Sequence, residues 1–347
     1  MKPFKKAIPV LLTVALVFSP SEFLSARTAR EKAPTPPTAL SALVIDGASG
    51  KILWSKEPDH LLPPASTTKL LTALVVLDEL SLDQVVTVDS SVVGTPPSRI
   101  NLRAGERFYV QDLLRALLIA SANDAARALA IAAAGSEYEF AQKMNRKAKE
   151  IGAHNSRFVK ASGLPAEGQV STAYDLMQIF RQVEGNSFFM RALAVKFAVI
   201  RSLDGRSFRL KNHNKLLWRD SREIIGKTGW TREARHCFIG RIRAGGKTVY
   251  VSVLGSRKAW NDIRYFADQF IGVPAASSNR QRSLNGGHDV WKIQTALRHA
   301  GFFKREPTGY YGLITKRAVY RFQKAHHLAS DGVVGPTTWE ALRRYLS

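Results

Sequence analysis

Cysteine is nearly absent from this sequence: Cys237 is the only one among 347 residues. A single thiol excludes an internal disulfide, so the fold must depend on its hydrophobic cores. Acidic residues are also scarce, because 28 Asp and Glu stand against 51 Lys and Arg, a formal net charge of +23. That imbalance favours an anionic environment such as nucleic acid, membrane headgroups or an acidic cell-wall polymer. The length allows two globular domains.

The apolar run at the N-terminus, residues 7–18, is too short to span a bilayer comfortably. Three lysines precede it and Ser19-Pro20 follows it, an arrangement typical of a secretory signal peptide. We therefore expect residues 1–26 to be a signal peptide and the protein to be exported, to a periplasm or an extracytoplasmic cell wall. Export argues against nucleic acid as a partner. No clean A-x-A cleavage site is present, so an uncleaved anchor is the alternative, and membrane contact is expected only through this segment.

The pattern of apolar and turn residues predicts an α+β domain over residues 39–272, after a charged, proline-rich linker at 27–38. Its first part reads as a β-hairpin at 41–55, followed by a short strand at 84–88. Helices are expected from about Ser66 to 77, over 110–135 with a break at 121–124, and at 136–151, 171–183 and 259–270, with Ser171 as an N-cap. Further strands are expected at 208–210, 222–227, 238–243 and 249–254. This order predicts an antiparallel sheet that shares one domain with a helical lobe.

The stretch Pro63-Pro64-Ala65-Ser66-Thr67-Thr68-Lys69 leads into apolar residues at 70–77. The prolines disfavour helix before Ala65, so Ser66 is expected at or near a helix start, one turn from Lys69 on the same face. The helix that follows is apolar on nearly every side and belongs inside the protein, where burial lowers the pKa of a lysine. A neutral amine beside a serine hydroxyl is a nucleophile with its base. A helix cap beside a snorkelling lysine explains the same pattern. This stretch alone therefore does not establish that Ser66 and Lys69 are catalytic.

Two more motifs follow in chain order. Ser121-Ala122-Asn123 falls at a predicted break between helices, and Lys227-Thr228-Gly229 ends a predicted strand. With S-x-x-K first, S-x-N second and K-T-G third, the chain strongly resembles the serine-type D-Ala-D-Ala carboxypeptidases, which are low-molecular-mass penicillin-binding proteins of the β-lactamase/transpeptidase-like superfamily. The resemblance covers residues 39–272, and the flanking Gly163-Leu164-Pro165 agrees with it.

The resemblance implies a catalytic role for three side chains. Ser66 attacks the carbonyl of the penultimate D-Ala and forms an acyl-enzyme, while Lys69 accepts the Ser66 proton as general base. Ser121 relays a proton toward the nitrogen of the leaving D-Ala. The expected substrates are peptidoglycan stem peptides, and β-lactams are the expected covalent inhibitors. No cofactor is implied.

The same resemblance implies a set of substrate-binding residues. Asn123 holds the substrate amide and Lys69, and Lys227 adds positive potential to the pocket. Thr228 hydrogen-bonds the terminal carboxylate, with Gly229 next in the same strand. The backbone N–H groups of Ser66 and Trp230 form the oxyanion hole, since an edge strand offers free N–H groups to an extended peptide.

Several alternatives stay open at this level. A D,D-endopeptidase that cuts crosslinks shares every motif, and a non-catalytic wall-binding or penicillin-sensing protein keeps the same fold. A class A β-lactamase needs an acidic residue to activate water, and Glu167 lies in the right region but lacks the Leu-Asn that usually follows. The family more often has Gly at the position of Ala122 and usually has Gly near Arg235, so the chain departs from the pattern at both places.

A polar linker at 273–286 separates a second module, residues 287–347. It carries the repeat G-x-x-G-x-x-T at Gly309 and Gly332, each before a predicted helix (315–325 and 337–345). It resembles the all-α, three-helix peptidoglycan-binding domain of wall hydrolases, which implies glycan as a partner, with Tyr310 and Tyr311 as candidate contacts. No metal site is expected, because the adjacent histidines His326 and His327 have no third ligand at helical spacing.

Overall fold

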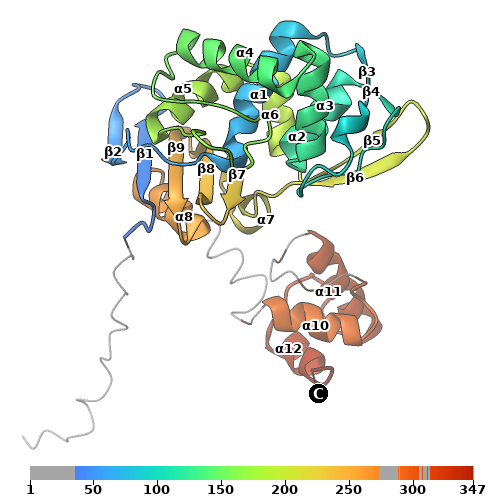
Figure 1. Ribbon diagram of the computed structural model, residues 1–347. Coiled ribbons are helices and arrows are strands. Elements are labelled where there is room, and N and C mark those ends of the chain that lie inside the picture. Colours follow the sequence, from blue (N-terminus) through green and yellow to red (C-terminus); the bar gives the residue numbers. More distant parts are fainter. Residues whose placement is uncertain are drawn as a thin grey trace, which may run out of the picture. The chain divides into compact units, whose positions relative to one another are not determined.

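The computed structural model describes residues 36–272, 288, 290–304, 307, 311 and 313–346. The predicted signal peptide at 1–26, most of the linker at 27–38 and the linker at 273–286 lie outside the described residues. None of the helices in the described part of the chain has the length and apolarity that a bilayer crossing requires. The expected α+β class, an antiparallel sheet with a helical lobe, is confirmed (Figure 1).

A five-stranded sheet forms the base of the first domain, in the order β2-β1-β9-β8-β7. Every neighbouring pair is antiparallel, and β7 lies at one edge. The hairpin expected at 41–55 is present as β1 and β2. The strands are β1 (Ser41–Asp46), β2 (Ile52–Lys56), β7 (Glu223–Thr231), β8 (Arg235–Ala244) and β9 (Lys247–Ser256). The strand expected at 222–227 therefore continues through the K-T-G motif to Thr231.

Alternation along these strands gives the sheet two buried faces. On one face, Val44, Phe238 and Val251 pack with the C-terminal helix of the domain, α8 (Ala259–Phe270), through Phe266 and its neighbours. On the other face, apolar residues of β1, β8 and β9 join the core of the helical lobe. Figure 1 shows α8 on one side of the sheet and the lobe on the other. The sheet thus holds β7 between two cores.

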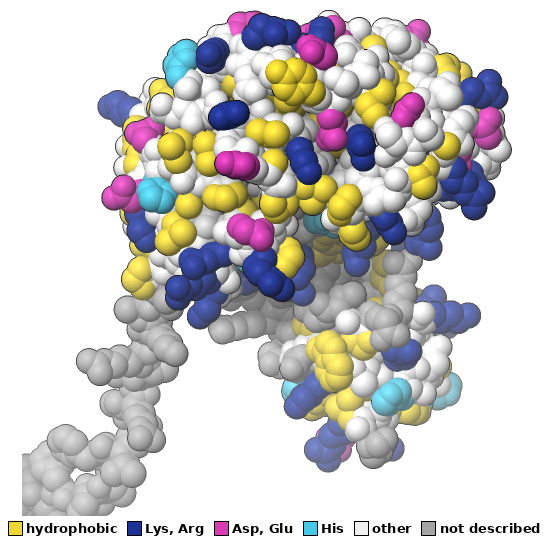
Figure 2. Space-filling view, in the orientation of Figure 1, with side chains coloured by type: hydrophobic (Ala, Val, Ile, Leu, Met, Phe, Trp, Pro, Cys, Tyr) yellow, Lys and Arg dark blue, Asp and Glu magenta, His cyan; other side chains and the backbone are white. Residues whose placement is uncertain are grey.

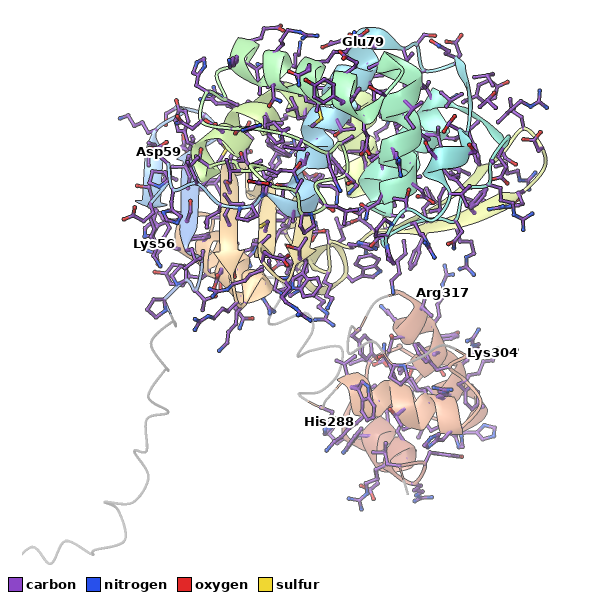
Figure 3. The ribbon with its side chains drawn as sticks, in the orientation of Figure 1. Lys56, Asp59, Glu79, His288, Lys304 and Arg317 are labelled. Carbon is purple, nitrogen blue, oxygen red and sulfur yellow. The ribbon has the colours of Figure 1, made fainter. Side chains whose placement is uncertain are left out.

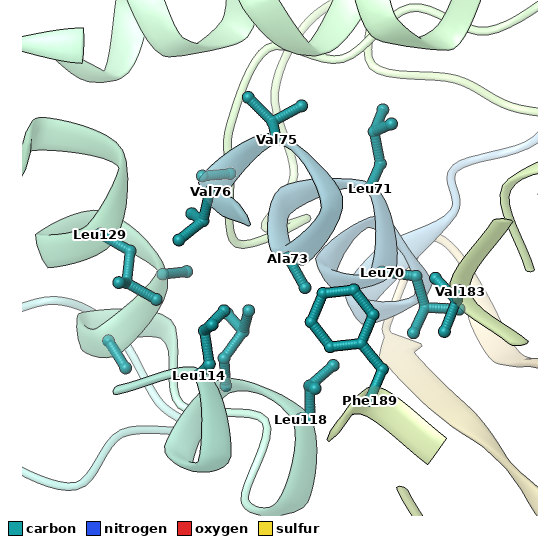
Figure 4. Close-up of a cluster of buried hydrophobic side chains, with 14 of the residues drawn as sticks. Leu70, Leu71, Ala73, Val75, Val76, Leu114, Leu118, Leu129, Val183 and Phe189 are labelled. Atoms are coloured by element: carbon teal, nitrogen blue, oxygen red, sulfur yellow. The ribbon is translucent and has the colours of Figure 1, made fainter. Parts of the chain in front are cut away.

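The helical lobe surrounds one buried helix, α1 (Lys69–Glu79). Leu70, Ala73 and Val76 are buried on different sides of α1 and contact residues of the neighbouring helices (Figure 4). Such enclosure fits its apolar sequence on nearly every side. The other helices of the lobe are α2 (Val110–Ile119), α3 (Asn123–Ala134), α4 (Glu137–Glu150), α5 (Ala173–Glu184) and α6 (Ser187–Ala194). Where α1 ends, Glu79 pairs with Lys143 of α4 at 2.7 Å, and Glu79 is labelled in Figure 3.

The N-cap of α5 differs from the expected Ser171. Thr172 is the cap, and its hydroxyl accepts a hydrogen bond from the backbone N–H of Asp175 at 2.9 Å. Ser171 is fully buried and its hydroxyl instead lies 2.8 Å from that of Ser156. The helix therefore starts one residue later than the sequence pattern predicts, a common uncertainty at helix ends.

Two small hairpins stand outside the main sheet. One pairs β3 (Val85–Thr87) with β4 (Arg107–Tyr109), and the other pairs β5 (Phe197–Arg201) with β6 (Ser207–Lys211). The strand expected at 208–210 is β6, so it belongs to a separate hairpin (Figure 1). Short helical turns complete the domain: two 3-10 turns, η2 (Ala65–Thr68) and η3 (Ser90–Val92), and α7 (Leu216–Arg219).

The C-terminal module has its own core. Its described helices are α10 (Val290–His299), α11 (Leu313–Ala325) and α12 (Pro336–Arg343), and Leu297, Phe322 and Leu342 meet between them. Gln323 accepts from the Gly332 N–H and donates to the Val333 carbonyl, both at 2.8 Å, which ties the second repeat turn to α11. Tyr311 is only 4% exposed and donates to the Gly332 carbonyl, so it is a core residue and the expectation of an exposed glycan contact is wrong. Tyr310 lies outside the described residues.

Positive charge is widely distributed over the visible surface. Lys and Arg side chains are scattered across the face shown in Figure 2 and do not form one continuous patch. Acidic side chains lie between them over the lobe. On this face the distribution agrees with a general attraction to an anionic polymer.

Candidate active site

Ser66 stands in the 3-10 turn η2, directly before α1. Ala65 in this turn has φ of +48°, an uncommon value for a residue other than glycine. The turn is held by Thr67, whose hydroxyl donates to the carbonyl of Pro64 at 2.6 Å. Ser66 keeps partial solvent exposure while Thr67 and Lys69 are buried. The predicted arrangement, a serine at a helix start with a lysine one turn later, is thus present.

Lys69 is fully buried, and its amine touches three oxygen atoms. Its Nζ lies 2.9 Å from the hydroxyl oxygen of Ser66, donates to Oδ1 of Asn123 at 2.7 Å and donates to the carbonyl of Ser162. Desolvation holds the pKa of Lys69 well below its ordinary value, and the nearby charge of Lys227 lowers it further. A neutral amine has two hydrogens and one lone pair. Asn123 and Ser162 accept the two hydrogens, so the lone pair is left for the Ser66 hydroxyl proton.

A second amine and hydroxyl pair lies beside the first. Lys227, 2% exposed, donates from Nζ to the hydroxyl of Ser121 and to the carbonyl of Thr228, both at 2.9 Å. Burial lowers the pKa of Lys227 to about 7. Ser121 occupies the break between α2 and α3 with φ of +56°, a backbone conformation that ends one helix before the next begins. The break expected from the sequence is therefore what aims this hydroxyl at Lys227.

Asn123 is the first residue of α3, and both its side chain and its backbone N–H are hydrogen-bonded. Its side chain accepts from Lys69 and donates from Nδ2 to the Pro96 carbonyl at 3.0 Å, while its backbone N–H donates to the Ser98 carbonyl at 2.7 Å. The next residue, Asp124, is buried and accepts from the backbone N–H groups of Ile100 and Leu102. The loop over residues 96–102 is thereby attached to the start of α3.

The K-T-G motif lies in β7, the edge strand, opposite residues 237–239 of β8. Gly229 packs against the turn of the nucleophile: a Cβ there would lie 2.9 Å from the backbone nitrogen of Ser66. Only glycine allows this approach, so the strand and Ser66 come together. The side chain of Trp230 is 62% exposed, and its ring lies 6.3 Å from that of His236.

The structure brings the predicted residues into one site. Ser66, Lys69 and Asn123 form one hydrogen-bonded group, Ser121 and Lys227 form the second, and Thr228, Gly229 and Trp230 follow in the adjoining strand. Arg235, near which the resembled pattern has glycine, has φ of +55°, a conformation that glycine adopts without steric cost. Chemically the site offers a nucleophile, an adjacent base, a buried cation with a second hydroxyl, and an open strand edge.

Sequence reasoning did not identify the Ser162 carbonyl, which fixes the orientation of the Lys69 amine. The only available signal was the neighbouring Gly163-Leu164-Pro165.

Comparisons with known proteins agree with this geometry. Residues 28–258 match the D-alanyl-D-alanine carboxypeptidase family, and residues 286–342 match a peptidoglycan binding domain. The D-alanyl-D-alanine carboxypeptidase DacB2 of Mycobacterium tuberculosis is 36% identical over 61% of this chain and 73% of its own length. The D-alanyl-D-alanine endopeptidase of Pseudomonas aeruginosa is 35% identical over 75% of this chain and 93% of its own length. The carboxypeptidase DacF of Bacillus subtilis is 31% identical over 73% of this chain and 66% of its own length.

Solved structures show the same fold. The D-alanyl-D-alanine carboxypeptidase of M. tuberculosis superposes with a TM-score of 0.64 and 32% identity, covering 70% of this chain and 94% of that one. The DD-transpeptidase of Streptomyces K15 superposes with a TM-score of 0.61 and 31% identity, covering 67% of this chain and 99% of that one. The resemblance in the three motifs therefore extends to the whole first domain.

Proposed function

Because the chain belongs to the D-alanyl-D-alanine carboxypeptidase family, we propose that it is an exported, penicillin-sensitive enzyme that removes the terminal D-Ala from peptidoglycan pentapeptides. The reaction proceeds through an acyl-enzyme on Ser66. The single observation that carries this proposal is the environment of Lys69: a fully buried amine 2.9 Å from the Ser66 hydroxyl, with its two other contacts taken by acceptors.

In the acylation step, Ser66 Oγ attacks the carbonyl carbon of the penultimate D-Ala and its proton passes to Lys69 Nζ. The carbonyl oxygen becomes an oxyanion that accepts hydrogen bonds from the backbone N–H groups of Ser66 and Trp230. Ser121 relays to the departing nitrogen the proton that Lys69 took from Ser66, the C–N bond breaks and free D-Ala leaves. Water then hydrolyses the Ser66 ester and returns the enzyme.

The binding strand orients the substrate for this step. The extended peptide lies along the open edge of β7, with its terminal carboxylate toward Lys227 and Thr228. The carboxylate favours the protonated amine of Lys227, and Gly229 lets the turn that carries Ser66 pack closely against β7. β-Lactams, which carry an acyl group and a carboxylate, occupy the same positions as covalent inhibitors.

The second module and the N-terminus place the enzyme at its substrate. The module over 287–347 holds peptidoglycan glycan and so raises the local concentration of stem peptides around the first domain. The signal segment at 1–26 directs export, and any membrane contact occurs only through it. This placement agrees with the net charge of +23, which suits an acidic wall polymer.

A D,D-endopeptidase is the second candidate function. The specific observation in its favour is the 35% identity to the P. aeruginosa endopeptidase over 93% of that protein. Both reactions use the same nucleophile, base and oxyanion hole. They differ in the leaving group, which is free D-Ala in one and the amine of a crosslinked peptide in the other.

The test is mass spectrometry of purified pentapeptide monomers and crosslinked dimers after incubation with residues 27–347. Loss of one alanine from the monomer with dimers intact supports the carboxypeptidase, whereas conversion of dimers to monomers moves the assignment to the endopeptidase. Ser66→Ala is the control, and it should neither cleave peptide nor bind fluorescent penicillin covalently. No cleavage of either substrate by a chain that still binds penicillin would indicate a sensor.

A further inference from the structure

A pocket of about 340 Å³ opens beside the nucleophile, at the end of β7 that lies beyond the K-T-G motif. Ala65 and Gly163 form its inner wall next to Ser66, and Thr231 lies on its β7 side. Two carboxylates, Glu167 and Glu233, also line it. None of its lining residues is a lysine or arginine, although the whole chain carries a net charge of +23. The only charged side chains that line the pocket are therefore acidic.

The direction of the bound peptide decides which of its residues reaches this pocket. The terminal carboxylate is placed at Lys227 and Thr228, and the scissile carbonyl at the N–H groups of Ser66 and Trp230. A peptide antiparallel to β7 thus runs from its C-terminus at residue 228 toward Thr231 with its preceding residues. The residue before the D-Ala-D-Ala unit arrives next to Thr231, where the pocket opens.

The walls of the pocket indicate what side chain it suits. Pro63, Pro165 and Ala166 provide apolar surface, which accommodates methylene groups. Glu167 and Glu233 are exposed, and neither forms an ion pair with another residue in the described part of the chain. Unpaired carboxylates at the rim of an apolar pocket fit a cation at the end of a hydrocarbon chain.

We propose that this pocket is a specificity site for the residue that precedes D-Ala-D-Ala, and that it takes a side chain ending in an ammonium group. Glu167 and Glu233 pair with the ammonium, and the apolar walls cover the methylene stem. The proposal rests on the proposed function and adds the substrate class to it, because stem peptides with a free side-chain amine become the preferred substrates. Peptides in which that amine is acylated lose the two ion pairs.

The experiment compares Nα-acetyl-L-Lys-D-Ala-D-Ala with the same peptide acetylated also on Nε, using the full chain without its signal segment. We expect kcat/KM to be about tenfold higher for the free amine, and the gain to appear mainly in KM. In the double variant Glu167→Gln/Glu233→Gln, this preference should fall to near unity while kcat/KM for the Nε-acetylated peptide stays unchanged. Raised salt should weaken the wild-type preference.

Glu139→Gln, at an exposed carboxylate on α4, is the matched control and should keep the full preference. The rate of acylation by benzylpenicillin, which lacks this side chain, should be the same in all variants and tests the proposed function independently. Equal kcat/KM for the two peptides in the wild type would overturn the pocket assignment. So would an unchanged preference in the double variant. Loss of penicillin acylation would instead count against the proposed nucleophile and base.

Discussion

Gly163 and Ala65 approach each other so closely that a Cβ on Gly163 would lie 2.0 Å from the Ala65 carbonyl oxygen. Gly163 also has φ of +75°, a conformation that glycine adopts without steric cost. The residue before it, Ser162, supplies the carbonyl that accepts from Lys69. This contact therefore fixes two things together: the turn that carries Ser66 and the direction of the Lys69 amine beside it.

Replacing Gly163 by alanine should disrupt both the turn that carries Ser66 and the orientation of the Lys69 amine. We expect Gly163→Ala to lower the free energy of unfolding by about 2–5 kcal/mol, from left-handed backbone strain and overpacking. Acylation by fluorescent penicillin should fall by more than a hundredfold, because Ser66 and Lys69 lose their alignment. Gly152→Ala is the matched control, since φ is +83° there but no atom lies closer than 4.0 Å to its Cβ position. Thermal unfolding and gel fluorescence measure the two effects, and similar acylation losses in both variants would contradict the steric explanation.

Lys69→Ala should remove the base while leaving the nucleophile in place. The rate of acylation should fall on the order of 10²- to 10⁴-fold, the usual contribution of general base catalysis. Circular dichroism checks that the fold is retained, and Lys51→Ala, at an exposed lysine in the β1–β2 turn, should acylate at the wild-type rate. Near-wild-type acylation in folded Lys69→Ala would mean that another group accepts the proton.

The pH dependence of kcat/KM should follow the two buried lysines. Because only the neutral amine of Lys69 can accept the Ser66 proton, activity should rise as pH rises through the lowered pKa of Lys69. Lys227 must be protonated to attract the terminal carboxylate, and its pKa is about 7, so activity should decline as pH rises above about 7. A substrate whose terminal carboxylate is methyl-esterified provides the control. For the ester, the decline above pH 7 should be absent; an identical decline for acid and ester would exclude Lys227 as its cause.

Cys237 should be chemically inert in the folded protein. The thiol is 2% exposed, and burial raises its pKa to about 12, so the reactive thiolate is scarce at pH 8. We expect no alkylation by iodoacetamide at pH 8 without denaturant and complete alkylation in guanidinium, as measured by intact mass. Rapid alkylation of the native protein would show that β8 opens easily next to the K-T-G strand, to which Cys237 is paired through Gly229.

Removal of residues 286–347 should separate wall binding from catalysis. The fraction of protein that sediments with purified sacculi should fall about tenfold or more, because the tether and its effective concentration are lost. Turnover of a small soluble peptide should stay unchanged, since every proposed site residue lies in the first domain. Equal sedimentation of the shortened and full chains would refute anchoring by this module.

The sequence predicted the three motifs and their helix, break and strand positions correctly because each is a local pattern. Ser66 and Lys69 needed only helical spacing, and Ser121 needed only a helix break. The ends of two elements differ from the prediction: α5 begins after Thr172 rather than Ser171, and β7 continues to Thr231. Capping hydrogen bonds and strand pairing decide those ends, and both depend on residues far away in the chain or on backbone geometry.

The Ser162 carbonyl and the pocket lined by Glu167 and Glu233 could not be predicted from local sequence patterns. Ser162 is 93 residues from Lys69, and a backbone carbonyl leaves no mark in the residue type. The sequence indicated Glu167 only as a possible activator of water, and no sequence pattern indicated Glu233. Their association depends on the loop after Gly163 meeting the end of β7, a contact that no spacing rule predicts.

By itself the sequence determined which groups are available: one serine and lysine pair at helical spacing, a second hydroxyl at a helix break, a third motif in a strand, and a cationic chain with a separate module. Only the tertiary structure decided the pKa values of those groups and the directions of their hydrogen bonds. Packing buries the amines of Lys69 and Lys227 and lowers their pKa values, and it supplies the acceptors that turn one lone pair toward Ser66. The desolvation of an amine and the direction of its lone pair depend on the atoms around it, and only the folded chain brings those atoms together.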